Sequence, residues 1–217
     1  MIPLRTCLIA LALAFSAAAA PAGPGEADFQ AFAQRVKLDP AELEACKKIS
    51  PKLFEMLSNR DNWAKWAKTI HERVGIFTPC EVRLMLVDEP KRDYFGKGGF
   101  LSKLGSHIKI NLPTVPKEPE RYFEEHMVHE LTHVMHYTIC VSGGAPDWLQ
   151  EGVAQYAAEQ YSRIARIRGG IVPITDLPAN LKGIPQYARA LLFFEYLEKV
   201  HGADKLRAAM KAIVAEK

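Results

Sequence analysis

The chain has 217 residues with 28 basic and 25 acidic side chains, which gives a formal net charge of +3. This length suits one domain with a sizeable hydrophobic core. Because the net charge is so small, we expect neither a nucleic-acid partner nor a membrane partner.

Residues 1–22 have the pattern of a signal peptide. Arg5 precedes an apolar run from Cys7 to Phe15, and the small residues from Ser16 to Ala22 offer a cleavage site. The run is too short to span a membrane comfortably. We therefore expect a Sec-type signal and a bacterial periplasmic or secreted protein that is not held at the membrane after cleavage. An uncleaved anchor is the alternative.

Residues 23–217 are predicted to form one domain whose first part, residues 26–75, is helical. Apolar residues recur there at helical spacing, and proline or capping residues separate the segments. We expect four short helices with their apolar stripes in the core. The stripes contain Phe29, Phe32, Ala33 and Val36, then Trp63, Trp66, Ala67, Ile70 and Val74, and the breaks fall at Asp39–Pro40, Ser50–Pro51 and Asn59.

The second part, residues 80–217, begins with two alternating runs that predict strands, residues 80–87 and 106–112. In the second run His107 and Asn111 are expected to face outward. The glycine- and lysine-rich residues between the runs, 88–105, predict a short extra strand or a mobile flap. We expect the second run to be the edge strand of a small mixed sheet, where an extended substrate peptide could add itself as a strand.

The residues that follow place two histidines four positions apart. His129 and His133 lie about 6 Å apart along a helix axis at about 40° of rotation, so both imidazoles can reach one ion. Glu130 lies about 100° round from His129, where its carboxylate reaches a water beside that ion more easily than the ion itself. Two neutral imidazoles suit Zn²⁺, and the carboxylate suits a proton acceptor for the attacking water.

Catalytic zinc needs a third protein ligand, and the next predicted helix offers Glu151. Residues 142–146 are rich in glycine and end in proline, which stops the first helix. Two helices joined by a tight turn can face each other. Glu151 would then lie opposite His129 and His133.

The segment from His129 to His133, with Glu151 inside Trp148–Gly152, resembles the gluzincin metallopeptidases, and in particular bacterial peptidase MA-like proteins. The resemblance covers the chain from about Cys80 to its end. It implies a zincin fold, one catalytic zinc per chain and peptide hydrolysis. By this analogy His129, His133 and Glu151 are the ligands and Glu130 is the general base.

Other residues are candidates for supporting roles. Similar enzymes place a tyrosine or histidine across the cleft from the metal, and Tyr187 is our choice to stabilise the oxyanion; Tyr156, Tyr161 and His201 are alternatives. Gln155, one turn after Glu151, could orient a ligand histidine. We expect His126 and His136 to pack at the two ends of the site.

Three cysteines follow the signal: Cys46, Cys80 and Cys140. One disulfide and one free thiol are compatible with an oxidising compartment, and all three pairings stay open. None has the spacing of a redox or zinc-ribbon site.

We therefore predict a single-domain, monomeric α+β protein of the zincin type, mostly helical, which hydrolyses peptide bonds with one zinc ion and Glu130. One alternative is a non-catalytic extracytoplasmic zinc-binding or assembly protein. A metal-free helical binding module is another. The choice between endopeptidase and aminopeptidase action stays open.

Overall fold

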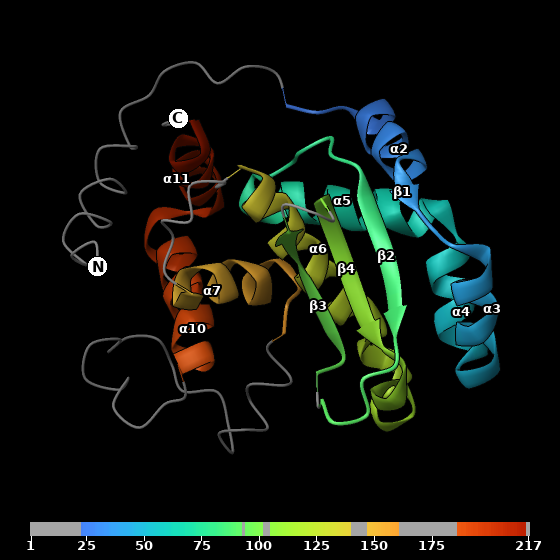
Figure 1. Ribbon diagram of the computed structural model, residues 1–217. Helices are drawn as coiled ribbons and strands as arrows, with labels where there is room; N and C mark the ends of the chain where they lie inside the picture. Colours follow the sequence, from blue (N-terminus) through green and yellow to red (C-terminus); the bar gives the residue numbers. More distant parts are fainter. Residues whose placement is uncertain (1–22, 93, 102–104, 140–146, 161–185, 216–217) are drawn as a thin grey trace.

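The computed structural model describes residues 23–92, 94–101, 105–139, 147–160 and 186–215. In these residues helices predominate and four strands form one small mixed sheet, consistent with the predicted α+β class (Figure 1). The predicted signal, residues 1–22, lies outside them. The elements are α2 Glu26–Gln34, β1 Val36–Lys37, α3 Pro40–Ile49, α4 Pro51–Ser58, α5 Arg60–Val74, β2 Val82–Val87, β3 Gly96–Leu101, β4 Gly105–Asn111, the 3-10 turns η1 Leu112–Lys117 and η2 Glu120–Tyr122, α6 Phe123–Ile139, α7 Asp147–Ala157, α10 Gln186–His201 and α11 Ala203–Ala215.

The four helices predicted before Gly75 are confirmed, together with the residues that separate them. The side chains of Asp39, Ser50 and Asn59 each accept a hydrogen bond from a backbone N–H in the first turn of the helix that follows. Gly75 ends α5 with φ of 73°, a left-handed conformation that glycine adopts without strain. The one element missed here is the two-residue strand β1.

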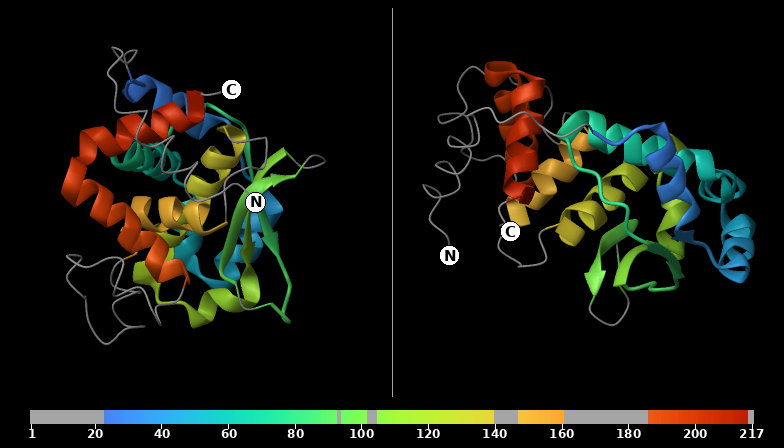
Figure 2. Two further views of the ribbon diagram at one scale, coloured as in Figure 1. Left: turned by 90° about the vertical axis from the view of Figure 1, so that its left-hand side faces the viewer. Right: turned by 90° about the horizontal axis from the view of Figure 1, so that it is seen from above.

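The predicted apolar stripes form the core beneath the sheet. Trp63 and Trp66 of α5 are 0% and 1% exposed, and their rings meet edge to face at 5.1 Å. Helix α5 packs against α2 on one side and α6 on the other. Helix α6 in turn lies between α5 and the sheet (Figure 2).

The sheet has the order β1-β2-β4-β3, with β1, β2 and β4 parallel and β3 antiparallel to β4. The predicted position of the edge strand was therefore wrong. β4, the last strand before α6, is internal, because residues 96–101 pair with it as the extra strand β3. That segment is the edge strand beside α6.

His107 and Asn111 point away from the α6 side, as expected, yet both are buried, at 4% and 0% exposure. Asn111 is buried because its side chain forms hydrogen bonds with the loop that leads into β3. Its Oδ1 accepts from the N–H of Glu89 at 3.0 Å, and its Nδ2 donates to the carbonyls of Glu89 and Arg92 at 3.1 and 3.2 Å. Asn111 thus fixes the approach to the edge strand.

Cys46 is a free cysteine, fully buried in the core, and burial raises the pKa of its thiol to about 11. Neither of the two disulfide pairings that involve Cys46 is formed. The third pairing, Cys80 with Cys140, includes a residue outside the described part of the chain.

No helix in the described ranges is both long enough and apolar enough to cross a membrane.

We expect Asn111→Ala to lower the free energy of unfolding by about 2–3 kcal/mol, because the substitution removes a fully buried side chain that makes three hydrogen bonds to the backbone of the 88–92 loop. Chemical denaturation measures this change, and tryptic cleavage after Arg92 should become faster. Asn62→Ala is the control, since the Asn62 side chain makes one hydrogen bond among the described residues, to the carbonyl of Met56 at 2.8 Å, and its loss should cost about 1 kcal/mol. An Asn111 variant as stable as this control would contradict the anchoring role.

Candidate metal centre

Three donor side chains from two helices meet at one point. The Nε2 atoms of His129 and His133 on α6 are 3.1 Å apart, and each lies 3.4 Å from a carboxylate oxygen of Glu151 on α7. The ligand atoms of all three residues lie within 4.8 Å of one another. The structure thus brings together the three residues that the sequence singled out.

The separations between these donors fit a metal ion. A tetrahedral ion with ligand bonds of about 2.0–2.2 Å holds its donors about 3.3–3.6 Å apart. The observed separations of 3.1, 3.4 and 3.4 Å are close to that range. Among the described residues this group of two imidazoles and one carboxylate could hold a metal ion.

Close packing of α7 on α10 positions Glu151. Gly152, the next residue, is buried, and a Cβ at this position would lie 2.9 Å from the Phe194 ring and 3.0 Å from Ala190. Only glycine lets the two helices approach this closely without a shift. The glycine that follows Glu151 therefore fixes the distance of α7 from α10, and with it the position of the carboxylate.

The charges around the two imidazoles favour a cation. Burial alone would raise the pKa of Glu151, but hydrogen bonds from His129 and His133 outweigh it and lower this pKa to about 2. Burial alone would lower the pKa of His133, but its hydrogen bond with Glu151 and the charge of Glu130 raise it above its usual value. Both pKa shifts arise because the carboxylate of Glu151 is held close to the buried imidazoles.

Glu130 points to the edge strand instead of joining the three donors. It is 8% exposed, and its Oε2 accepts a hydrogen bond from the backbone N–H of Gly98 at 2.5 Å. This N–H points away from β4, because the carbonyl of Phe95 pairs with Asn111 and successive residues of an antiparallel strand alternate between the two edges. The open edge of β3 therefore fixes the carboxylate of Glu130.

Two glycines of β3 make this contact possible. A Cβ at Gly98 would overlap the carbonyl oxygen of Glu130, and one at Gly96 would lie 2.9 Å from its Cγ. Our interpretation of the glycine-rich segment as an extra strand or a flap missed this role. Glycine inside a strand is a known signal of close backbone approach.

His126 and His136 flank the site, as expected. His126 is 5% exposed, stacks on Phe95 at a ring separation of 4.6 Å, and its Nε2 lies 2.9 Å from a carboxylate oxygen of Glu118. Burial and then the charge of His133 lower the pKa of His136 to about 4, so this ring is neutral near pH 7. Glu118 was not singled out in the sequence, which offers no motif for it.

The role expected for Gln155 is not seen. The Nδ1 of His129 and the Oε1 of Gln155 are both buried, and neither has a hydrogen-bond partner within the described ranges. Buried polar atoms of this kind are usually satisfied by ordered water. Gln155 therefore does not accept a hydrogen bond from the ligand histidine in this structure.

The candidates for oxyanion stabilisation are only partly described. Tyr187 lies in the first turn of α10, but its side chain is outside what the structure describes, and so is all of Tyr161. Tyr156 is 1% exposed, with the Arg73 guanidinium 4.8 Å from its ring centroid. His201 is exposed at the end of α10.

Comparisons with protein-family models, with curated proteins and with solved structures find no match to this chain. The function of the protein is therefore inferred from the geometry and charge of the site. The resemblance to gluzincins stays a prediction.

We expect Gly98→Ala to lower the free energy of unfolding by about 1–3 kcal/mol, because the added methyl group forces β3 away from α6. Urea denaturation tests this, and Gly25→Ala is the control, since its Cβ would meet nothing nearer than 4.0 Å. Equal stability of the two variants would contradict the close contact between the backbone of Gly98 and the backbone of Glu130.

Proposed function

We propose that this protein is a zinc-dependent peptidase of the gluzincin type with a zincin-like fold. The observation that carries the proposal is the convergence of His129, His133 and Glu151. Glu130 follows the first of these ligands in the chain and lines the same cavity as His129. Two imidazoles and a carboxylate are a donor set of catalytic zinc sites. An antiparallel edge strand beside the metal helix supports the fold assignment.

The zinc ion, when bound by His129, His133 and Glu151, supplies Lewis-acid activation of water and of the substrate carbonyl. Glu130 acts as the general base: it takes a proton from the attacking water and delivers it to the departing amine. The N–H of Gly98 holds the Glu130 carboxylate in one orientation before substrate arrives. We assign oxyanion stabilisation to Tyr187.

The substrate is a peptide that binds in an extended conformation along β3. Residues 96, 98 and 100 present backbone groups to the open edge of this strand, because successive residues of an antiparallel strand alternate between its two edges. The N–H of Gly98 is held by Glu130, so a peptide would pair with the other groups of this edge. A peptide that pairs there would use main-chain hydrogen bonds for affinity and side-chain pockets for specificity. We propose that the protein acts as a monomer in the periplasm or as a secreted enzyme.

We expect Glu130→Gln to lower kcat for peptide hydrolysis by a factor of about 10²–10⁴ or more while zinc content is kept, because the amide cannot accept the proton. Glu124→Gln is the control, as Glu124 lies on the same helix and, within the described ranges, forms an exposed ion pair with Lys65. Peptide cleavage followed by mass spectrometry, with zinc measured in parallel, checks both. A Glu130 variant that binds zinc and cleaves at the wild-type rate would exclude the mechanism.

Zinc binding without any cleavage by the wild-type protein would favour the alternative, a non-catalytic zinc-binding or assembly protein.

A further inference from the structure

A cavity of about 260 Å³ opens directly beside the candidate metal centre. His129 and Glu130 form one wall, and the segment from Tyr94 to Gly96, the turn with Lys117 and Glu118, and Gln160 form the others. Sites for whole small molecules usually measure about 300–1,000 Å³. This smaller cavity suits a single side chain of a peptide whose reacting bond lies at the metal.

The carboxylate of Glu118 is held at this cavity by a rigid support. Its Oε1 lies 2.9 Å from Nε2 of His126, and the His126 ring stacks on Phe95, which stacks on Phe123 at 5.5 Å. The side chain of Glu118 is 23% exposed. The other oxygen, Oε2, has no hydrogen bond among the described residues, so it can accept one from a ligand.

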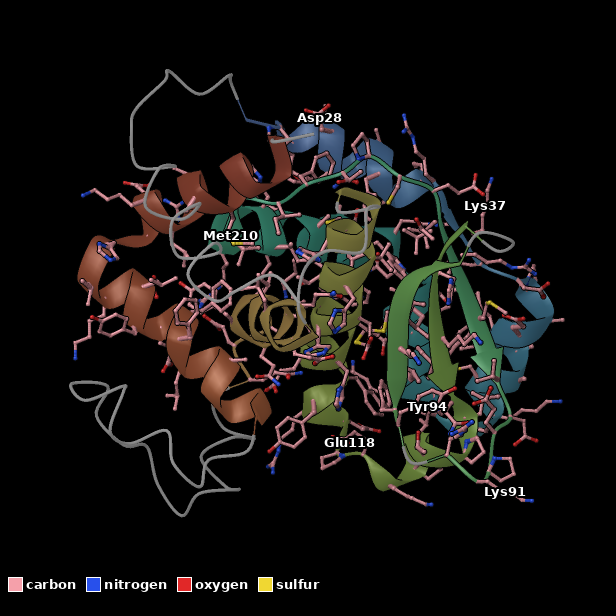
Figure 3. The ribbon with its side chains drawn as sticks, turned by 60° about the vertical axis from the view of Figure 1, so that its left-hand side comes forward. Asp28, Lys37, Lys91, Tyr94, Glu118 and Met210 are labelled. Carbon is pink, nitrogen blue, oxygen red and sulfur yellow. The ribbon has the colours of Figure 1, made fainter. Side chains whose placement is uncertain are left out.

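Tyr94 lines the same cavity as this carboxylate. Tyr94 and Glu118 lie at the same end of the sheet, near the start of α6 (Figure 3). The Tyr94 hydroxyl donates to Glu89 at 2.6 Å and its carbonyl accepts from Thr114 Oγ1 at 3.1 Å, so this residue is fixed. An aromatic surface beside a carboxylate suits a long side chain with a methylene stem and a cationic head.

The charged residues that line the cavity also favour a cationic ligand. Lys117 also lines it but is exposed, and among the described residues it forms no ion pair, so its ammonium group can stay in water. Glu130 is engaged by Gly98 and Glu151 by the two imidazoles. Glu118 is therefore the fixed carboxylate available to a bound substrate.

We propose that this cavity receives the side chain of an arginine or lysine residue next to the peptide bond that is cut, and that Glu118 determines this specificity. The proposal rests on the peptidase function proposed above. It adds the substrate class, which is peptides with a basic residue adjacent to the cleaved bond.

The test uses a mixture of synthetic peptides that together contain every possible pair of neighbouring residue types. The full-length protein loaded with zinc digests this mixture, and mass spectrometry identifies the bonds that are cut. Wild-type protein should cut next to arginine or lysine. In matched peptides that differ only in arginine or norleucine at that position, Glu118→Gln should lower kcat/KM for arginine by about 10- to 100-fold, the range expected for losing one hydrogen bond to a charged group. The norleucine peptide should be cut at an unchanged rate.

Glu120→Gln is the control, because Glu120 is exposed at the start of η2, two residues after Glu118, and is not among the residues that line the cavity. Glu118→Lys should move the preference toward acidic side chains. Cleavage by wild type with no preference for basic residues, or a Glu118→Gln variant with an unchanged arginine-to-norleucine ratio, would overturn the specificity and leave the peptidase function intact. A zinc-loaded wild type that cuts no peptide would overturn the peptidase function itself.

Discussion

Helix α6 has to contact β3 on one side and α7 on the other, and the candidate site depends on both contacts. Gly96 and Gly98 allow the first, because a side chain at either position would collide with Glu130. Gly152 sets α7 against α10, and α7 carries Glu151 to the two histidines. The remaining helices and strands hold these contacts in place.

The same arrangement concentrates charge where water is scarce. Glu130 and His133 are 8% and 7% exposed, and burying ionisable groups is costly unless they are paired or bind a metal. A cation between His129, His133 and Glu151 would relieve this cost, so metal binding should also stabilise the fold. The cavity with Glu118 extends the site along the first turns of α6.

Local patterns in the sequence predict much of the fold. Capping residues and prolines mark the first helices, apolar stripes mark their buried faces, and alternation marks β2 and β4. These signals act over a few residues, so they can be read from the chain directly. The three donors are found because helical spacing relates His129 to His133, and because α7 follows α6 closely in the sequence and packs against it.

The errors concern contacts between distant parts of the chain. The order of strands depends on long-range pairing, so β3 was not assigned to the edge and β1 was missed. Burial of Asn111 depends on a loop that folds over it, and the pairing of Glu118 with His126 depends on how the chain between η1 and η2 passes α6. Neither leaves a periodic signal in the sequence.

Elemental analysis of the purified protein, for wild type and Glu151→Ala, tests the central claim most directly. One zinc ion per chain in wild type, weakened or lost in Glu151→Ala, is the result that the metal centre predicts. Wild-type protein without stoichiometric zinc, even after reconstitution with the metal, would contradict it and leave the cluster of His129, His133 and Glu151 without a role in metal binding.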